Sequence, residues 1–115
     1  MWTMANLASS RENTMNIPNQ IQLAGIVIDI VCDGTMVQKQ SKIGDARYCE
    51  QVIVMDQTTA PADTTEQAFW HELMHWILFI MNRDDLRNDE TFVDISAHLL
   101  YQAVKSGGFI IPESA

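Results

Sequence analysis

The alternation of apolar and polar residues in the first half of the chain predicts β-strands. Two short alternating runs follow one another, and the parity of the alternation switches at Ala24-Gly25, as it does at a tight turn between paired strands. We therefore expect strands at residues 20–24 and 26–32. A second hairpin is predicted at residues 43–48 and 52–56, because the latter segment is rich in residues that favour strands.

The second half of the chain predicts two helices. Asp63 stands at an expected N-cap with Glu66 three residues later, which is a variant of the capping box, and neither Pro nor Gly follows until Gly107. A helix at residues 64–82 is expected from there. After a charged turn, apolar residues recur at helical spacing and predict a second helix at residues 89–105.

These elements predict an α+β domain in which a small antiparallel sheet of two hairpins precedes two helices. The length of 115 residues allows one hydrophobic core, and an apolar fraction of 47% is typical of a globular chain. Residues 1–14 are polar and aperiodic, so we expect them to form a flexible tail. The single domain would then comprise residues 15–115.

The charge and composition of the chain indicate which partners and which compartment to expect. Seven Lys and Arg against fifteen Asp and Glu give a net charge of -8, and no basic cluster is present to neutralise phosphates, so neither nucleic acid nor membrane is expected as a partner. Residues 68–81 are strongly apolar but too short to span a bilayer. Two cysteines are too few for a disulfide framework, and the first twenty residues lack a secretory signal. A cytoplasmic protein is therefore predicted.

The candidate chemistry lies in the first helix, where His71-Glu72-Leu73-Met74-His75 forms an HExxH motif. Residues i and i+4 share a helical face, so both imidazoles can reach one zinc ion while Glu72 projects toward a metal-bound water. A glutamate between two histidines on so apolar a helix would be costly to bury without a cation. The competing interpretation is a metal-free core helix with hydrogen-bonded histidines.

A catalytic zinc ion needs a third protein ligand. Glu90 is the strongest candidate because it opens the second helix after a turn that can fold that helix back. Asp94, one helical turn later, could then accept the remaining N–H of a ligand histidine. Asp89 is a close competitor for the ligand role and Cys49 a distant one. Acidic residues in a first helical turn also complement the helix dipole, which is the ordinary explanation for Glu90 and Asp94.

The sequence HELMH, followed by ETFVD on the next helix, resembles the gluzincin metallopeptidases, in which HExxH precedes a ligand Glu and an Asp four positions later. At this length the chain is most similar to the minigluzincins and to short ImmA/IrrE-type or phage-encoded metallopeptidase-like proteins, over residues 16–105. The resemblance implies a Zn2+ cofactor, a general base and an orienting carboxylate, with ligands His71, His75 and Glu90, base Glu72 and orienting residue Asp94.

The resemblance also implies a place for the substrate. Residues 52–55 would be the edge strand beside the cleft, where an extended peptide can add its backbone hydrogen bonds. Tyr48, His98 and Tyr101 are the candidate donors to the transition-state oxyanion, although each has a simpler structural interpretation. The large side chains of the first helix are expected to pack in the core, namely Phe69, Trp70, Met74, Trp76, Phe79 and Met81.

The predicted function is zinc-dependent hydrolysis of a peptide or unfolded protein, with Glu72 activating metal-bound water. The intact Glu72 favours catalysis, since a purely structural site has no need of a base. The rival hypothesis is a metal-binding or interaction module of the same fold that acts as a regulator through a protein partner. A third is a latent enzyme whose cleft is occupied by residues 1–14 or 109–115.

Overall fold

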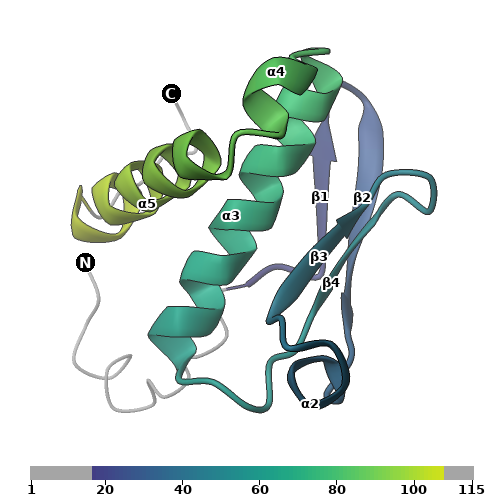
Figure 1. Cartoon of the computed structure of the whole chain (residues 1–115), viewed down its shortest axis with the longest axis vertical. Coiled ribbons are helices and arrows are strands. Elements are labelled where there is room, and N and C mark those ends of the chain that lie inside the picture. Colours follow the sequence, from purple (N-terminus) through teal and green to yellow (C-terminus); the bar gives the residue numbers. More distant parts are fainter. Residues whose placement is uncertain (1–16, 108–115) are drawn as a thin grey trace, which may run out of the picture.

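The computed structural model describes residues 17–107 (Figure 1). The predicted tail at residues 1–14 lies outside this range. The elements, in chain order, are β1 (Gln20–Leu23), β2 (Ile26–Cys32), α2 (Met36–Gln40), β3 (Gly44–Arg47), β4 (Val52–Met55), α3 (Ala62–Ile80), α4 (Asp84–Arg87) and α5 (Glu90–Gly107).

Four strands form one mixed sheet in the order β1-β2-β4-β3. β1 pairs antiparallel with β2, and β3 with β4, which confirms both predicted hairpins and the α+β class. At the first turn Ala24 and Gly25 have φ values of 50° and 81°, the left-handed pair that a two-residue type I′ hairpin turn requires.

The two hairpins are joined by parallel pairing of β2 with β4, in which Ile30 lies opposite Ile53. The sheet is therefore mixed rather than wholly antiparallel as predicted. The physical reason is the connection through α2, which places β3 at the edge of the sheet. The returning β4 then fills the gap beside β2 and runs in the same direction as β2.

β4 is a central strand, so the prediction that residues 52–55 form the edge beside the cleft is wrong. Ile53, Val54 and Met55 are all buried, and a strand with a continuous apolar run is most stable between two neighbours. The edge on the side of the site is β3, whose sequence GDAR is polar enough for an exposed edge.

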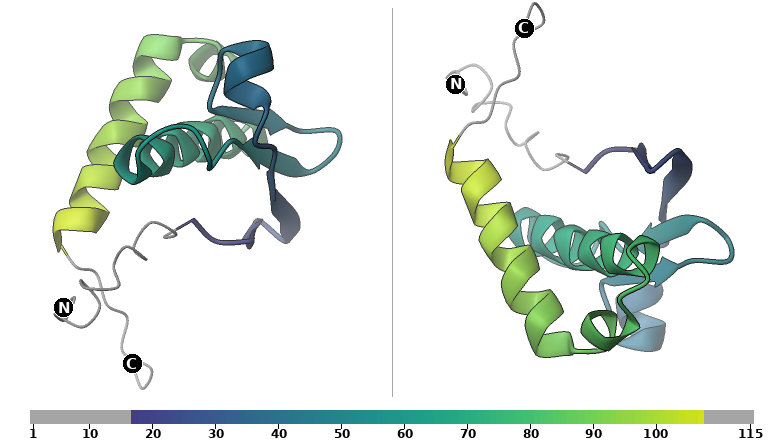
Figure 2. Two further views of the ribbon diagram at one scale, coloured as in Figure 1. Left: turned by 90° about the horizontal axis from the view of Figure 1, so that it is seen from below. Right: turned by 90° about the horizontal axis from the view of Figure 1, so that it is seen from above.

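α3 lies between the sheet and α5, as the two further views show (Figure 2). One cluster of buried side chains joins α3 to the sheet, comprising Ile17, Ile28, Ile53, Met55, Phe69 and Trp76. A second joins α3 to α5, comprising Met74, Leu78, Val93 and Ala97. Two faces of α3 are thereby covered, which explains why apolar residues occur on more than one face of its second half.

Three of the predicted core residues of α3, Phe69, Met74 and Trp76, are buried, and Trp70 is partly buried against both clusters. Phe79 and Met81 are not core residues, with 40% and 57% of their surface exposed. Met81 follows the last residue of α3 and lies outside its packed interfaces with the sheet and α5. The Phe79 ring stacks on the Tyr48 ring, with the two ring centroids 4.3 Å apart, and remains partly open to solvent.

The start of α3 differs from the predicted capping box. The helix begins at Ala62 after Pro61, and no side chain in the described part of the chain caps it. Glu66 instead is buried, and its Oε1 accepts hydrogen bonds from Tyr101 at 2.8 Å and Lys105 at 2.6 Å on α5. Glu66 therefore forms a long-range ion pair with Lys105 instead of the predicted cap.

None of the helices within residues 17–107 is both long and apolar enough to cross a membrane.

Asp56, directly after β4, fixes the connections at this end of the sheet. Its buried carboxylate accepts hydrogen bonds from the backbone N–H groups of Val37 and Thr58, each at 3.0 Å, and from the hydroxyls of Thr58 and Thr59. These bonds, that of Val37 foremost, lower the pKa of Asp56 to about 2. The carboxylate thus ties α2 and the loop before α3 to the end of β4.

Asp56→Asn should lower the melting temperature by several degrees at pH 7 and by much less near pH 2.5. A carboxyl whose pKa is lowered on folding stabilises the fold above its ordinary value of 3.8, and that contribution disappears as the pH falls toward about 2. Thermal unfolding at the two pH values measures the difference. Asp85→Asn is the control, because Asp85 also has a pKa of about 2 but lies in an exposed ion pair with Arg83. Equal shifts for both variants would contradict the role given to Asp56.

Candidate metal centre

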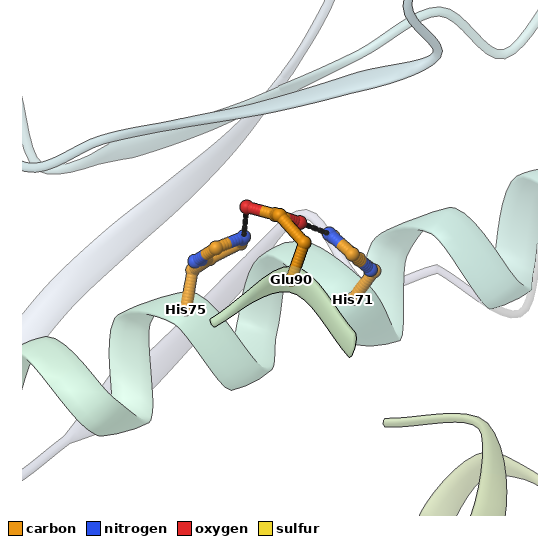
Figure 3. Close-up of side chains that lie close together, drawn as sticks. All are labelled: His71, His75 and Glu90. Carbon is orange, nitrogen blue, oxygen red and sulfur yellow. Dashed lines mark hydrogen bonds and ion pairs between the residues drawn. The ribbon is translucent and has the colours of Figure 1, made fainter. Parts of the chain in front are cut away.

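Two histidines from α3 and a glutamate from α5 converge on one point (Figure 3). His71 Nε2 lies 3.1 Å from Glu90 Oε1, and His75 Nε2 lies 3.3 Å from Glu90 Oε2. One ligand atom from each of the three residues lies within 4.8 Å of the others. Donors bound tetrahedrally to zinc at about 2.0–2.2 Å are separated by roughly 3.3 Å. The cluster therefore fits a single metal ion with two nitrogen ligands and one oxygen ligand.

Local structure explains the convergence. The i, i+4 spacing places both histidines on one face of α3. The short α4 and the turn after it then return the chain, so that Glu90 begins α5 beside that face. Asp94, one turn later, lies 3.3 Å from His71 Nδ1 through its Oδ1. This is the position from which a carboxylate orients a ligand imidazole.

The two competing ligand candidates lie outside the cluster. The Oδ1 atom of Asp89 accepts a hydrogen bond from the Phe92 N–H at 3.1 Å, so this carboxylate caps the start of α5. Cys49 is a free, exposed residue in the turn between β3 and β4. The geometry therefore favours Glu90 over both.

Glu72 lies beside the cluster and packs against the edge strand. A Cβ atom added to Gly44 of β3 would lie 2.8 Å from Glu72 Cγ and 3.0 Å from Met55 Sδ, so only glycine leaves room for this side chain. Burial raises the pKa of Glu72 to about 7, although the nearby His71 opposes the shift. Burial also lowers the pKa of His75, which favours the neutral imidazole that a metal binds.

Two pockets flank the cluster, and β3 borders both. The wide pocket, of about 420 Å³, is lined by residues including Ser41, Lys42, Gly44, His71, Glu72 and Asp94. The small pocket, of about 180 Å³, is lined by residues including Tyr48, Glu72, His75, Arg87, Asn88 and Glu90. A ligand lying along the edge of β3 would pass from one pocket across the cluster into the other.

Among the three candidate oxyanion donors, only Tyr48 lines a pocket beside the cluster. His98 Nδ1 lies 2.7 Å from Gln67 Nε2, and the Tyr101 hydroxyl donates to Glu66, both in a separate pocket of about 320 Å³. Burial, followed by the hydrogen bond to Glu66, raises the pKa of Tyr101 to about 12. His98 and Tyr101 lie away from the cluster because α5 runs from the cluster toward the start of α3.

Arg87 and Asn88 line the small pocket but were not singled out from the sequence. In the sequence they belong to a charged turn, and charged turns are usually solvated. Their one distinguishing signal is proximity to Glu90, which follows within three residues.

Searches against models of protein families, curated proteins and solved structures find no match to this chain. The site is therefore described from its own sequence motif and geometry. It is an α+β domain in which two histidines of a helical HExxH motif and a glutamate at the start of α5 lie close enough together to hold a metal ion.

Proposed function

We propose that this protein is a zinc-dependent peptidase with a minimal gluzincin-like site. The observation that carries the proposal is the convergence of His71, His75 and Glu90 within 4.8 Å, with Glu72 of the same motif beside them. A purely structural zinc site is closed by four protein ligands, whereas a catalytic site has three and leaves one position open. Three ligands and a neighbouring carboxylate match the catalytic arrangement.

Each residue has a distinct task in this proposal. A zinc ion held by the three ligands would supply a Lewis acid for the scissile carbonyl and lower the pKa of a bound water. Glu72 accepts the proton from the attacking water and passes it to the leaving amine nitrogen. Asp94 Oδ1, which lies 3.3 Å from His71 Nδ1, orients the ring and so the direction of Nε2.

The edge strand β3 supports a peptide or unfolded protein as the substrate. Within residues 17–107 no strand pairs with its outer side, and both pockets beside the cluster include residues of β3. An extended peptide could therefore pair with β3 by backbone hydrogen bonds and cross the cluster. Residues 44–47, rather than residues 52–55 as predicted from the sequence, are therefore the proposed edge for pairing with the substrate.

A second candidate function is binding of a protein partner, and the exposed apolar residues of α5 favour it. Phe92, Ile95 and Leu99 lie along one stripe of the helix and are 37%, 55% and 59% exposed. Stripes of this kind occur at protein interfaces. The third hypothesis, a latent enzyme blocked by residues 1–14 or 109–115, concerns segments outside the described range.

The proposal is tested by zinc content and proteolysis on the same preparation. Elemental analysis of the purified full-length chain should find one zinc per chain, and the protein should cleave an unfolded polypeptide. Removal of the metal with 1,10-phenanthroline should stop cleavage, and added zinc should restore it. Stoichiometric zinc without chelator-sensitive cleavage would reject the peptidase and favour the binding module. Absence of zinc would reject the zinc peptidase and leave partner binding through α5 as the candidate.

Gly44→Ala should slow peptide cleavage by about 10- to 100-fold while zinc stays bound. The added methyl group would push Glu72 out of position, and displacements of about 1 Å at a reacting group can cost 100-fold. Steady-state kinetics and zinc content measure the two effects separately. Gly34→Ala is the matched control, because its methyl group would contact Thr58 instead and Gly34 lines neither pocket. A normal rate for Gly44→Ala would show that the position of Glu72 is not critical.

A further inference from the structure

The small pocket beside the metal cluster contains a cation that the proposed hydrolysis does not use. Arg87, the last residue of α4, lines this pocket with His75 and Glu90. Only 22% of its side chain is exposed. Most of the side chain is therefore packed against protein atoms, while Asp84 pairs with its charge.

The guanidinium of Arg87 is held in place from two sides. Its central carbon lies 5.2 Å from the centre of the Tyr48 ring and 5.8 Å from that of Phe79, and these two rings stack on each other. Its Nε and Nη2 atoms donate to the same oxygen of Asp84, at 3.2 and 3.0 Å. A guanidinium has five N–H groups; Asp84 uses two of them and the Tyr48 hydroxyl is a further acceptor, so donors remain for another partner.

Three carboxylates line the small pocket, and among residues 17–107 none of the three is paired with Arg87. Glu72 lies against Gly44 of β3. Asp45 is paired with Lys42 and Arg47. Glu90 faces the two histidines of the cluster. Asp84, the carboxylate that pairs with Arg87, is 61% exposed and does not line the pocket. Arg87 is therefore available to an anion that enters the pocket.

We propose that Arg87 binds a carboxylate group of the substrate in the small pocket, so that the enzyme prefers an acidic residue or a chain terminus next to the bond it cleaves. This inference rests on the proposed function. A planar guanidinium binds a carboxylate through two parallel hydrogen bonds, a geometry that neutral groups do not match. A pocket of about 180 Å³ is smaller than the roughly 300–1,000 Å³ of sites for larger ligands. It suits one side chain or one chain end.

Three blocked tripeptides test the proposal by calorimetric titration. Acetyl-Ala-Glu-Ala-amide carries an acidic side chain, acetyl-Ala-Gln-Ala-amide is its neutral counterpart, and acetyl-Ala-Gln-Ala with a free carboxyl end carries only a terminal carboxylate. The zinc-loaded protein is studied as Glu72→Gln to prevent turnover, and the metal-free protein as the natural chain. Each peptide is titrated into both forms, with and without Arg87→Met, which keeps the apolar stem against Tyr48 and Phe79.

One of the two carboxylate peptides should bind about 10- to 100-fold more tightly than the neutral peptide, as charge-assisted hydrogen bonds imply. Arg87→Met should abolish this preference without changing the affinity for the neutral peptide, and Arg87→Lys should retain part of it. Arg83→Met is the matched control, since Arg83 pairs with Asp85 in the same segment but lines neither pocket. The peptide that is preferred identifies the source of the carboxylate.

The two proposals fail in distinguishable ways. If the natural chain binds no zinc, the proposed function is wrong, while the titrations of metal-free protein still measure the preference for a carboxylate. If neither form of the protein discriminates between charged and neutral peptides, or if Arg87→Met weakens all three peptides equally, the assignment of Arg87 is overturned.

Discussion

Alanine at His71, His75 or Glu90 should lower the affinity for zinc on the order of 1,000-fold. Within residues 17–107 these three side chains form the cluster of donors, and zinc binding to zinc-finger peptides is worth about 10–16 kcal/mol. Loss of one donor in three removes roughly a third of that free energy, which corresponds to two to four powers of ten. Competition titration with a chromophoric zinc chelator measures the constants directly.

Two further variants make this experiment specific. Asp94→Ala should weaken zinc binding by only about 10- to 100-fold, because Asp94 acts through the ring of His71. Asp89→Ala should change zinc affinity by no more than a few-fold, since its carboxylate caps α5. Zinc loss in Asp89→Ala combined with normal binding in Glu90→Ala would transfer the ligand role to Asp89.

The same variants should differ in how zinc affects their stability. A ligand that binds only the folded state raises stability by RT ln(1 + [L]/Kd), so zinc should raise the melting temperature of the natural chain. At the same zinc concentration this increase should be nearly absent in His71→Ala and Glu90→Ala. A similar increase in all variants would indicate that zinc binds elsewhere on this acidic chain.

The local parts of the fold and site were predictable from the sequence. Strand parity and the turn at Ala24-Gly25 identified the first hairpin, because both signals depend on neighbouring residues. The HExxH spacing fixed the relation of His71 to His75 as soon as the segment was helical. Glu90 was within reach because only residues 81–89, which include the short α4, separate it from α3 and limit where α5 can begin.

The parts that depend on long-range packing were not predictable. The position of β3 at the edge follows from the path through α2 and from parallel pairing of β2 with β4, neither of which leaves a signal in strand parity. Glu66 matched a capping box locally, yet its partners Tyr101 and Lys105 lie on another helix. Arg87 reaches the small pocket only because α4 interrupts the turn and the stacked rings of Tyr48 and Phe79 hold it there.

Glu72→Gln should lower the rate of peptide cleavage by about 1,000-fold while the protein retains one zinc per chain. Proton transfer by a positioned side chain typically contributes 100- to 10,000-fold, and glutamine has nearly the same shape but cannot accept the proton of the attacking water. The substitution leaves His71, His75 and Glu90 in place. The variant should therefore keep its zinc while its cleavage rate falls, whereas a variant that has lost its fold would lose both.

Glu66→Gln is the matched control for this last experiment, because it is the same chemical change at a buried position of the same helix. Glu66 bonds to Tyr101 and Lys105 and lines neither pocket beside the cluster. Its replacement should lower the melting temperature and leave the rate of cleavage, measured well below that temperature, within a few-fold. If Glu72→Gln cleaves as fast as Glu66→Gln, Glu72 is not the base, and the HExxH helix is a metal-binding element without the chemistry proposed for it.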